Sequence, residues 1–308
     1  MNPSRSRPLL ALALLLVLPV LAAVILSPAA FNGLQSLGER TGILSKLTDA
    51  RFERVAVRIA MLTALIILIP VIRLTGLVPV IKRGLIPTPP RWRDLGWGIL
   101  IALASMIGLY GSGWALGAYA LTSDLPGLGT LTAMLLGFLL GAVFIGLFEE
   151  IFFRSFIHGA LRTRLQLLTA TLLSSAFFSA IHFFRPRFPQ EISRASWHSG
   201  LDLLPVMFSR FQWSQDWAFM ITLFLMGVTL ALFYEKRGNL YLIAGLHGGW
   251  VLAMRTGSYL FDRTPETLTF LFGSGSLISK APLAIVVISW FLVAALLTKP
   301  RDIPPVTT

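Results

Sequence analysis

Long apolar segments are the feature that most constrains what this chain can fold into. About eight runs approach the roughly 20 apolar residues that a helix needs to cross a bilayer. They lie near residues 9–27, 55–80, 95–121, 131–157, 166–184, 217–234, 240–255 and 282–298. Of the 308 residues, 55% are hydrophobic and only 13% are charged, which is more apolar than a soluble domain of this size requires. We therefore predict an all-α fold, a polytopic transmembrane helix bundle that forms one integral membrane domain over residues 1–308.

The basic residues explain the net charge of +12 without a nucleic-acid partner. They cluster in short segments between the apolar runs, and most clusters fall on the same side of an eight-span topology. The positive-inside rule makes that side cytoplasmic, so both termini are expected in the cytoplasm, most simply of a bacterial inner (cell) membrane. These clusters are Arg5 with Arg7, Lys82 with Arg83, Arg91 with Arg93, Arg162 with Arg164, Lys236 with Arg237, and Lys299 with Arg301.

The opposite side carries one basic segment that weakens this pattern. Residues 185–216 contain four arginines, the first of them Arg185, together with several Trp and Phe residues. Arginine and aromatic residues together are typical of a segment that lies at the membrane interface. Long outer segments count less in the rule, so the predicted orientation stands.

Two glutamates lie inside an apolar run. Glu149 and Glu150 follow an apolar stretch and precede three further apolar residues. A charge at such depth costs at least about 2.5–3.5 kcal/mol, so an interhelical ion pair or a catalytic role is expected. Arg154 stands four residues after Glu150 and shares its helix face, whereas Glu149 points about 100° away. One carboxylate is thus anchored by an arginine, and its neighbour can face another helix.

Two of the four histidines lie in apolar spans as well. If the chain turns near Leu165, Glu149 and His182 are almost equally far from the turn and reach a similar depth. His247 lies among Gly245, Gly248 and Gly249, which permit close helix approach or leave room for a ligand. A simple topology places His247 at a shallower depth than Glu149. The fourth and fifth helices must then project past the membrane, or one of them must bend.

Three motifs in this order resemble a known family. Glu149-Glu150-Ile151-Phe152-Phe153-Arg154 looks like the EExxxR motif of the CAAX protease and bacteriocin-processing (CPBP, or Abi) family of intramembrane endopeptidases. Phe178 to His182 is similar to its FxxxH motif, and His247 resembles the histidine of its later HxxxN motif. The resemblance covers residues 131–255, which we take as a CPBP-like catalytic core. Val251 stands where the family commonly has asparagine; the adjacent Trp250 offers an indole N–H donor.

The resemblance implies a catalytic role for each of these residues. Glu149 would activate a water with the help of His182, His247 would stabilise the oxyanion, and Glu150 with Arg154 would hold the surroundings in place. The partners would be membrane lipid and a peptide or membrane-protein substrate. We expect no cofactor; zinc bound by Glu149, His182 and His247 is the alternative, since one Glu and two His can form an open zinc site. The absence of cysteine excludes thiol nucleophiles and iron–sulfur sites.

Two hypotheses from other classes remain beside the protease. Val251 in place of asparagine motivates a non-catalytic membrane scaffold, an immunity protein or a regulatory protein of the same fold. Intramembrane Glu, Arg and His residues are also typical of proton relays in transporters, although no symmetric halves with broken helices are visible in the sequence.

Overall fold

The computed structural model describes residues 7–41, 51–85, 91–184, 186–264, 267–273 and 278–300. Arg5, Arg185 and Arg301, to which the predicted orientation refers, lie outside these residues. Most of the described chain is helical, which confirms the predicted all-α fold. The chain forms two compact units. The first comprises residues 1–78 and 180–211, and the second comprises residues 79–179 and 212–308.

Five described helical segments are long and apolar enough to cross a membrane. They are α1 (Pro8–Thr41), α3 (Phe52–Leu74), α5 (Trp92–Ala115), the continuous segment that starts with α6 (Leu128–Glu150), and α10 (Trp213–Arg237). The other three predicted spans also contain helices, namely α8 (Leu167–Ile181), α11 (Tyr241–Leu260) and α13 (Pro282–Leu297).

Apolar side chains point outward on several of these helices. Ile66, Leu140 and Trp290 are each 71% exposed, where a soluble protein would place polar residues. Lipid removes such side chains from water, so the chain is an integral membrane protein, as predicted.

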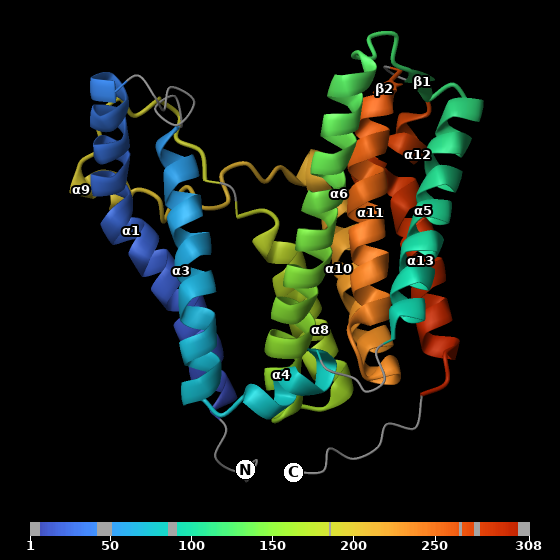
Figure 1. The fold of residues 1–308 in the computed structure, drawn as a ribbon, viewed down its shortest axis with the longest axis horizontal. Coiled ribbons are helices and arrows are strands. Elements are labelled where there is room, and N and C mark those ends of the chain that lie inside the picture. Colours follow the sequence, from blue (N-terminus) through green and yellow to red (C-terminus); the bar gives the residue numbers. More distant parts are fainter. Residues whose placement is uncertain are drawn as a thin grey trace. The chain divides into compact units, whose positions relative to one another are not determined.

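The first unit is built on the pair α1 and α3, which lie side by side (Figure 1). Phe31 and Phe52 pack edge to face between them, and Leu203 joins the same buried cluster. The Asn32 side chain donates to the Ala195 carbonyl at 2.8 Å and accepts from the Ala195 N–H at 2.9 Å. These contacts bind the segment with the short helix α9 (Trp197–Leu201) to the helix pair.

In the second unit, α11 lies between α5 and α6, while α10 packs against α13 (Figure 1). Small residues allow these close approaches. A Cβ atom added at Gly98 would overlap the backbone of α11, and one added at Gly146 would lie 2.7 Å from the Gly248 nitrogen. The glycines around His247 therefore serve close helix packing, the first of the two predicted uses.

Short elements complete this unit. β1 (Tyr119–Leu121) pairs antiparallel with β2 (Phe261–Arg263), so the chain after α5 is joined to the chain after α11. Arg263 donates to the Ala118 carbonyl at 2.7 Å and to the Gly273 carbonyl at 2.8 Å. The remaining short helices are α4 (Val78–Leu85), α7 (Gly159–Arg162), α12 (Thr269–Phe272) and the 3₁₀ turn η3 (Ile278–Lys280).

Candidate active site

The two glutamates lie where the helix changes its geometry. α6 ends at Glu150, the π-helix η2 (Ile151–His158) follows without a break, and α7 continues to Arg162. π-helical turns are rare and frequently mark functional sites. The span predicted near residues 131–157 is helical throughout, but its last turns, from Ile151 onward, are π-helical rather than α-helical. The wider π turns change which side chains share a face.

Glu150 and Arg154 form the predicted ion pair at the junction with this π-helix. Glu150 Oε2 lies 3.3 Å from Arg154 Nε, and the side chains are 0% and 2% exposed. The guanidinium also lies over the Phe178 ring, 4.7 Å from its centroid. The ring face is electronegative and favours a cation there. Glu150 is therefore a structural carboxylate, held by a buried cation of its own helix.

His247 reaches this pair from α11. Its Nδ1 lies 2.7 Å from Glu150 Oε1. A carboxylate only accepts hydrogen bonds, so Nδ1–H of His247 donates to Glu150. The close packing of Gly146 and Gly248 brings α11 within reach of α6 at this level.

Glu149 faces the other side of the same imidazole. Its Oε2 lies 3.8 Å from His247 Nε2, and its side chain is 26% exposed, compared with 0% for Glu150. The distance is longer than a hydrogen bond. Two adjacent carboxylates of one helix thus face the two nitrogens of one histidine: Glu150 is fully buried, and Glu149 has a partly exposed side chain whose Oε2 atom is itself buried.

The two helices that flank the turn near Leu165 differ in length. The continuous segment Leu128–Arg162 has 35 residues, about 50 Å at 1.5 Å per residue, which is longer than the roughly 30 Å hydrocarbon core of a bilayer. α8 has 15 residues, about 22 Å, which is shorter. The projection of both helices past the membrane therefore stays a prediction.

His182 lies in the first unit, whereas Glu149, Glu150, Arg154 and His247 lie in the second. It is half-buried in the turn that directly follows α8. The chain turns between α7 and α8 at residues 163–166, which agrees with the turn expected near Leu165. The meeting of His182 with Glu149 stays a prediction.

Trp250 does not supply a donor to this group. Its indole N–H donates to Ser105 Oγ of α5 at 3.1 Å, and its ring packs edge to face against Phe291. The Trp250 side chain thus contributes to the packing of α11 against α5 and α13.

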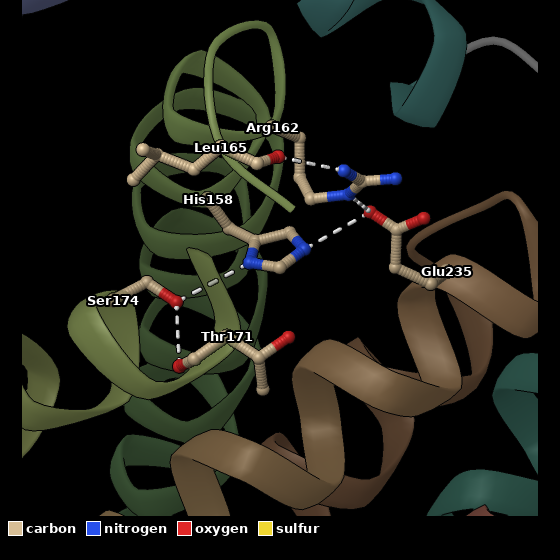
Figure 2. Close-up of polar contacts among 6 residues, drawn as sticks. All are labelled: His158, Arg162, Leu165, Thr171, Ser174 and Glu235. Carbon is tan, nitrogen blue, oxygen red and sulfur yellow. Dashed lines mark hydrogen bonds and ion pairs between the residues drawn. The ribbon is translucent and has the colours of Figure 1, made fainter. Parts of the chain in front are cut away.

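A second buried histidine carries a similar group, shown in Figure 2. His158 Nε2 lies 3.0 Å from Glu235 Oε1, and Arg162 Nε donates to the same oxygen at 3.1 Å. His158 Nδ1 lies 3.3 Å from Ser174 Oγ. These contacts join the end of the long helix to α8 and α10.

Sequence analysis did not single out His158 or Glu235, although a signal was present. Glu150, Arg154, His158 and Arg162 recur at every fourth residue. Residues four apart in a helix share a face, so this spacing predicts a polar stripe. Glu150 and Arg154 belong to the group around His247, and His158 and Arg162 form the second group.

Among the described residues, no three or more His, Cys, Asp and Glu side chains form a group that could hold a metal ion. His247 nevertheless has one feature that suits a metal ligand. A carboxylate on Nδ1 orients the ring and makes Nε2 the better ligand atom. Glu149 and His247 Nε2 could thus supply two ligands of the zinc site suggested by sequence, and the contribution of His182 stays a prediction.

Comparison with known protein families supports the motif assignment. Residues 129–253 match the family model described as type II CAAX prenyl endopeptidase Rce1-like. The match begins in α6, ends in α11 and includes all three motifs, so the resemblance to the CAAX proteases is confirmed over these residues. Searches of curated proteins and of solved structures give no match.

Proposed function

We propose that this chain is an intramembrane endopeptidase of the CAAX-protease type, which hydrolyses peptide bonds of a peptide or membrane protein near the membrane surface. The observation that carries the proposal is the position of His247 between two glutamates. One glutamate is buried in an ion pair, and the other is partly open. A histidine oriented by one carboxylate and facing a second is a typical arrangement of acid–base groups in hydrolases.

The partly open side of this group provides the general base. Two atoms 3.8 Å apart, as Glu149 Oε2 and His247 Nε2 are, can each hydrogen-bond to one shared oxygen atom at about 2.8 Å. In the proposed reaction this oxygen is the attacking water. Glu149 takes one proton from this water while the water oxygen bonds to the peptide carbonyl carbon. His182 would position the same water, as the family resemblance implies.

The remaining steps use the same groups. His247 Nδ1–H donates to Glu150, so Nε2 can donate a hydrogen bond as well only when the ring carries both protons. Glu149 and Glu150, which face this ring, are suitable partners for the imidazolium cation. Nε2–H then stabilises the oxyanion of the tetrahedral intermediate. When the intermediate collapses, the C–N bond breaks, and Glu149 passes its proton to the leaving amine. The enzyme returns to its initial state.

Glu150 and Arg154 position these groups without touching the substrate. Both side chains are at most 2% exposed. A buried ion pair that loses one partner leaves an uncompensated charge. The pair therefore holds the ring of His247 in one orientation.

Substitution of Glu149 tests the proposal. Glu149→Gln keeps the size of the side chain but removes the base, so cleavage of a fluorogenic reporter peptide in proteoliposomes should decrease by about 10²–10⁴-fold. Glu235→Gln is the matched control, since Glu235 is similarly exposed at 27% and also faces a histidine. It should retain activity within a few-fold.

Retained cleavage in Glu149→Gln would defeat the protease mechanism. The scaffold hypothesis predicts a different result, namely no cleavage by the wild-type protein and equal partner function in Glu149→Gln. A transporter would show ion or solute flux in the same proteoliposomes without cleavage.

Zinc is the alternative to the metal-free mechanism, and chelation distinguishes the two. Bound zinc would polarise the carbonyl and activate the water. In the metal-free mechanism, extensive treatment with 1,10-phenanthroline leaves the cleavage rate unchanged. Loss of activity that added zinc restores would instead assign Glu149 and His247 to a metal site.

A further inference from the structure

The second unit contains a cavity of about 580 Å³ at some distance along the helices from the glutamates. Four helices contribute its walls, namely the first half of α5, the last two turns of α10, the first half of α11 and the last half of α13. The lining residues are Arg91, Arg93, Asp94, Trp97, Ile101, Phe233, Arg237, Leu242, Leu246, Phe291 and Ala294.

This cavity is separate from the candidate active site. On α11 it is lined by Leu242 and Leu246, which are four residues apart and share one face. His247 points about 100° away from Leu246 and contacts the glutamates of α6. Neither glutamate lines the cavity. A ligand could therefore bind here without occupying the position of the attacking water.

The lining has one charged end and one apolar end. Arg91 and Arg93 lie at the start of α5, and Arg237 lies in the last turn of α10; Asp94 is the single acidic residue among them. Three cations and one anion leave this end net positive. The N-terminus of α5 adds partial positive charge of its own. The other lining residues are apolar or aromatic.

Neighbouring aromatic residues indicate the level of the charged end in the membrane. Trp92 packs edge to face on Tyr241, and Trp97 is 56% exposed. Trp and Tyr are enriched at the level of lipid headgroups. Ile101 lies ten residues after Arg91 on α5, which is about 15 Å along the helix. The cavity thus runs from the headgroup level into the hydrocarbon.

We propose that this cavity binds an anionic phospholipid. The lipid phosphate lies among Arg91, Arg93 and Arg237, and one acyl chain follows the apolar wall of Ile101, Leu246 and Phe291. A guanidinium pairs well with phosphate oxygens. A soluble anion would gain nothing from the apolar wall, and a zwitterionic lipid such as phosphatidylcholine would bring a choline cation that the three arginines repel.

Native mass spectrometry of the delipidated full-length protein tests this assignment. Phosphatidylglycerol should bind and phosphatidylcholine should not. Arg91→Gln/Arg93→Gln should weaken phosphatidylglycerol binding by about 30-fold, since each of the two basic residues near the membrane surface contributes a factor of about five. Arg164→Gln is the control, because Arg164 is an exposed arginine of another basic cluster outside the cavity. It should change binding by roughly twofold or less.

A second variant separates the acyl chain from the phosphate. Ile101→Trp fills the apolar end, where Ile101 is 42% exposed, and leaves every arginine in place. It should also lose phosphatidylglycerol binding. Equal binding of the two lipids, an equal effect of Arg164→Gln, or retained binding in Ile101→Trp would overturn the proposal. Displacement of the lipid by inorganic phosphate alone would overturn it too, since the site would then recognise only the anion.

Discussion

Two histidine groups lie near one continuous helix, and they differ in what surrounds the imidazole. At His247, one nitrogen is hydrogen-bonded to buried Glu150, while the other faces the partly exposed Glu149 at 3.8 Å. At His158, both nitrogens lie within hydrogen-bond distance of protein groups, Ser174 and Glu235. The ion pair of Glu150 with Arg154 beside His247 is buried, whereas Arg162 and Glu235 beside His158 are 33% and 27% exposed.

This difference separates a group that can act on an external molecule from one that joins helices. A ring with both nitrogens occupied by the protein has no atom left for a substrate or a water. His158 therefore holds the end of the long helix to α8 and α10. His247 keeps one nitrogen opposite a second carboxylate, and that is the side to which we assign the proposed reaction.

The largest expected contrast is between the two histidines themselves. His247→Gln should decrease kcat of reporter cleavage by about 10²–10³-fold, because it removes the proposed oxyanion donor. His158→Gln should leave kcat within a few-fold and lower only the stability. Steady-state kinetics of both variants in proteoliposomes measure this contrast. Equal losses of kcat would remove the functional distinction between the groups.

The arginines should differ next, in stability. Arg154→Met leaves Glu150 buried without its cation, which should lower the free energy of unfolding by about 3–5 kcal/mol. Arg162→Met removes a half-exposed partner of Glu235 and should cost about 0–1 kcal/mol. Titration with SDS in mixed micelles gives both values.

The double variant Glu150→Gln/Arg154→Met sharpens this test. It removes both charges of the buried pair together, so it should be more stable than Arg154→Met alone. If Arg154→Met and Arg162→Met had the same stability, the buried pair would not be what orients His247.

The smallest contrast concerns two adjacent serines of α8. Ser174 Oγ lies 3.3 Å from His158 Nδ1 and also donates to the Thr171 carbonyl at 3.1 Å. Ser174→Ala should cost about 1 kcal/mol of unfolding free energy. Ser175 is equally buried, and its hydroxyl has no hydrogen-bond partner among the described residues. Ser175→Ala should therefore be neutral or slightly stabilising, and a larger loss in Ser175→Ala would contradict this account of the second group.

Much of the fold follows from local patterns in the sequence. Each of the eight apolar runs contains a helix, because a helix satisfies all its backbone hydrogen bonds within the membrane. The spacing of Glu150 and Arg154 predicted their ion pair, since side chains four residues apart meet on one helix face. The order of the three motifs predicted the family resemblance over residues 129–253.

Contacts between helices could not be predicted in the same way. The π-helix after Glu150 has no signature in the apolar pattern, which predicted only that this span is helical. Distance from the turn near Leu165 was compared only for Glu149 and His182. It therefore gave no reason to expect contacts of His247 with both glutamates. Glu235 was not singled out from the sequence, yet it is the partner of His158.

Local sequence patterns were enough to predict the membrane-spanning helices and the polar residues within them, because hydropathy and helical spacing act over one to a few turns. Tertiary structure decided which of these residues meet. Glu150 and His247 are 97 positions apart, and their contact depends on the close packing of α6 against α11 at Gly146 and Gly248. Such a contact is set by the shapes of two helix surfaces, which local spacing does not specify.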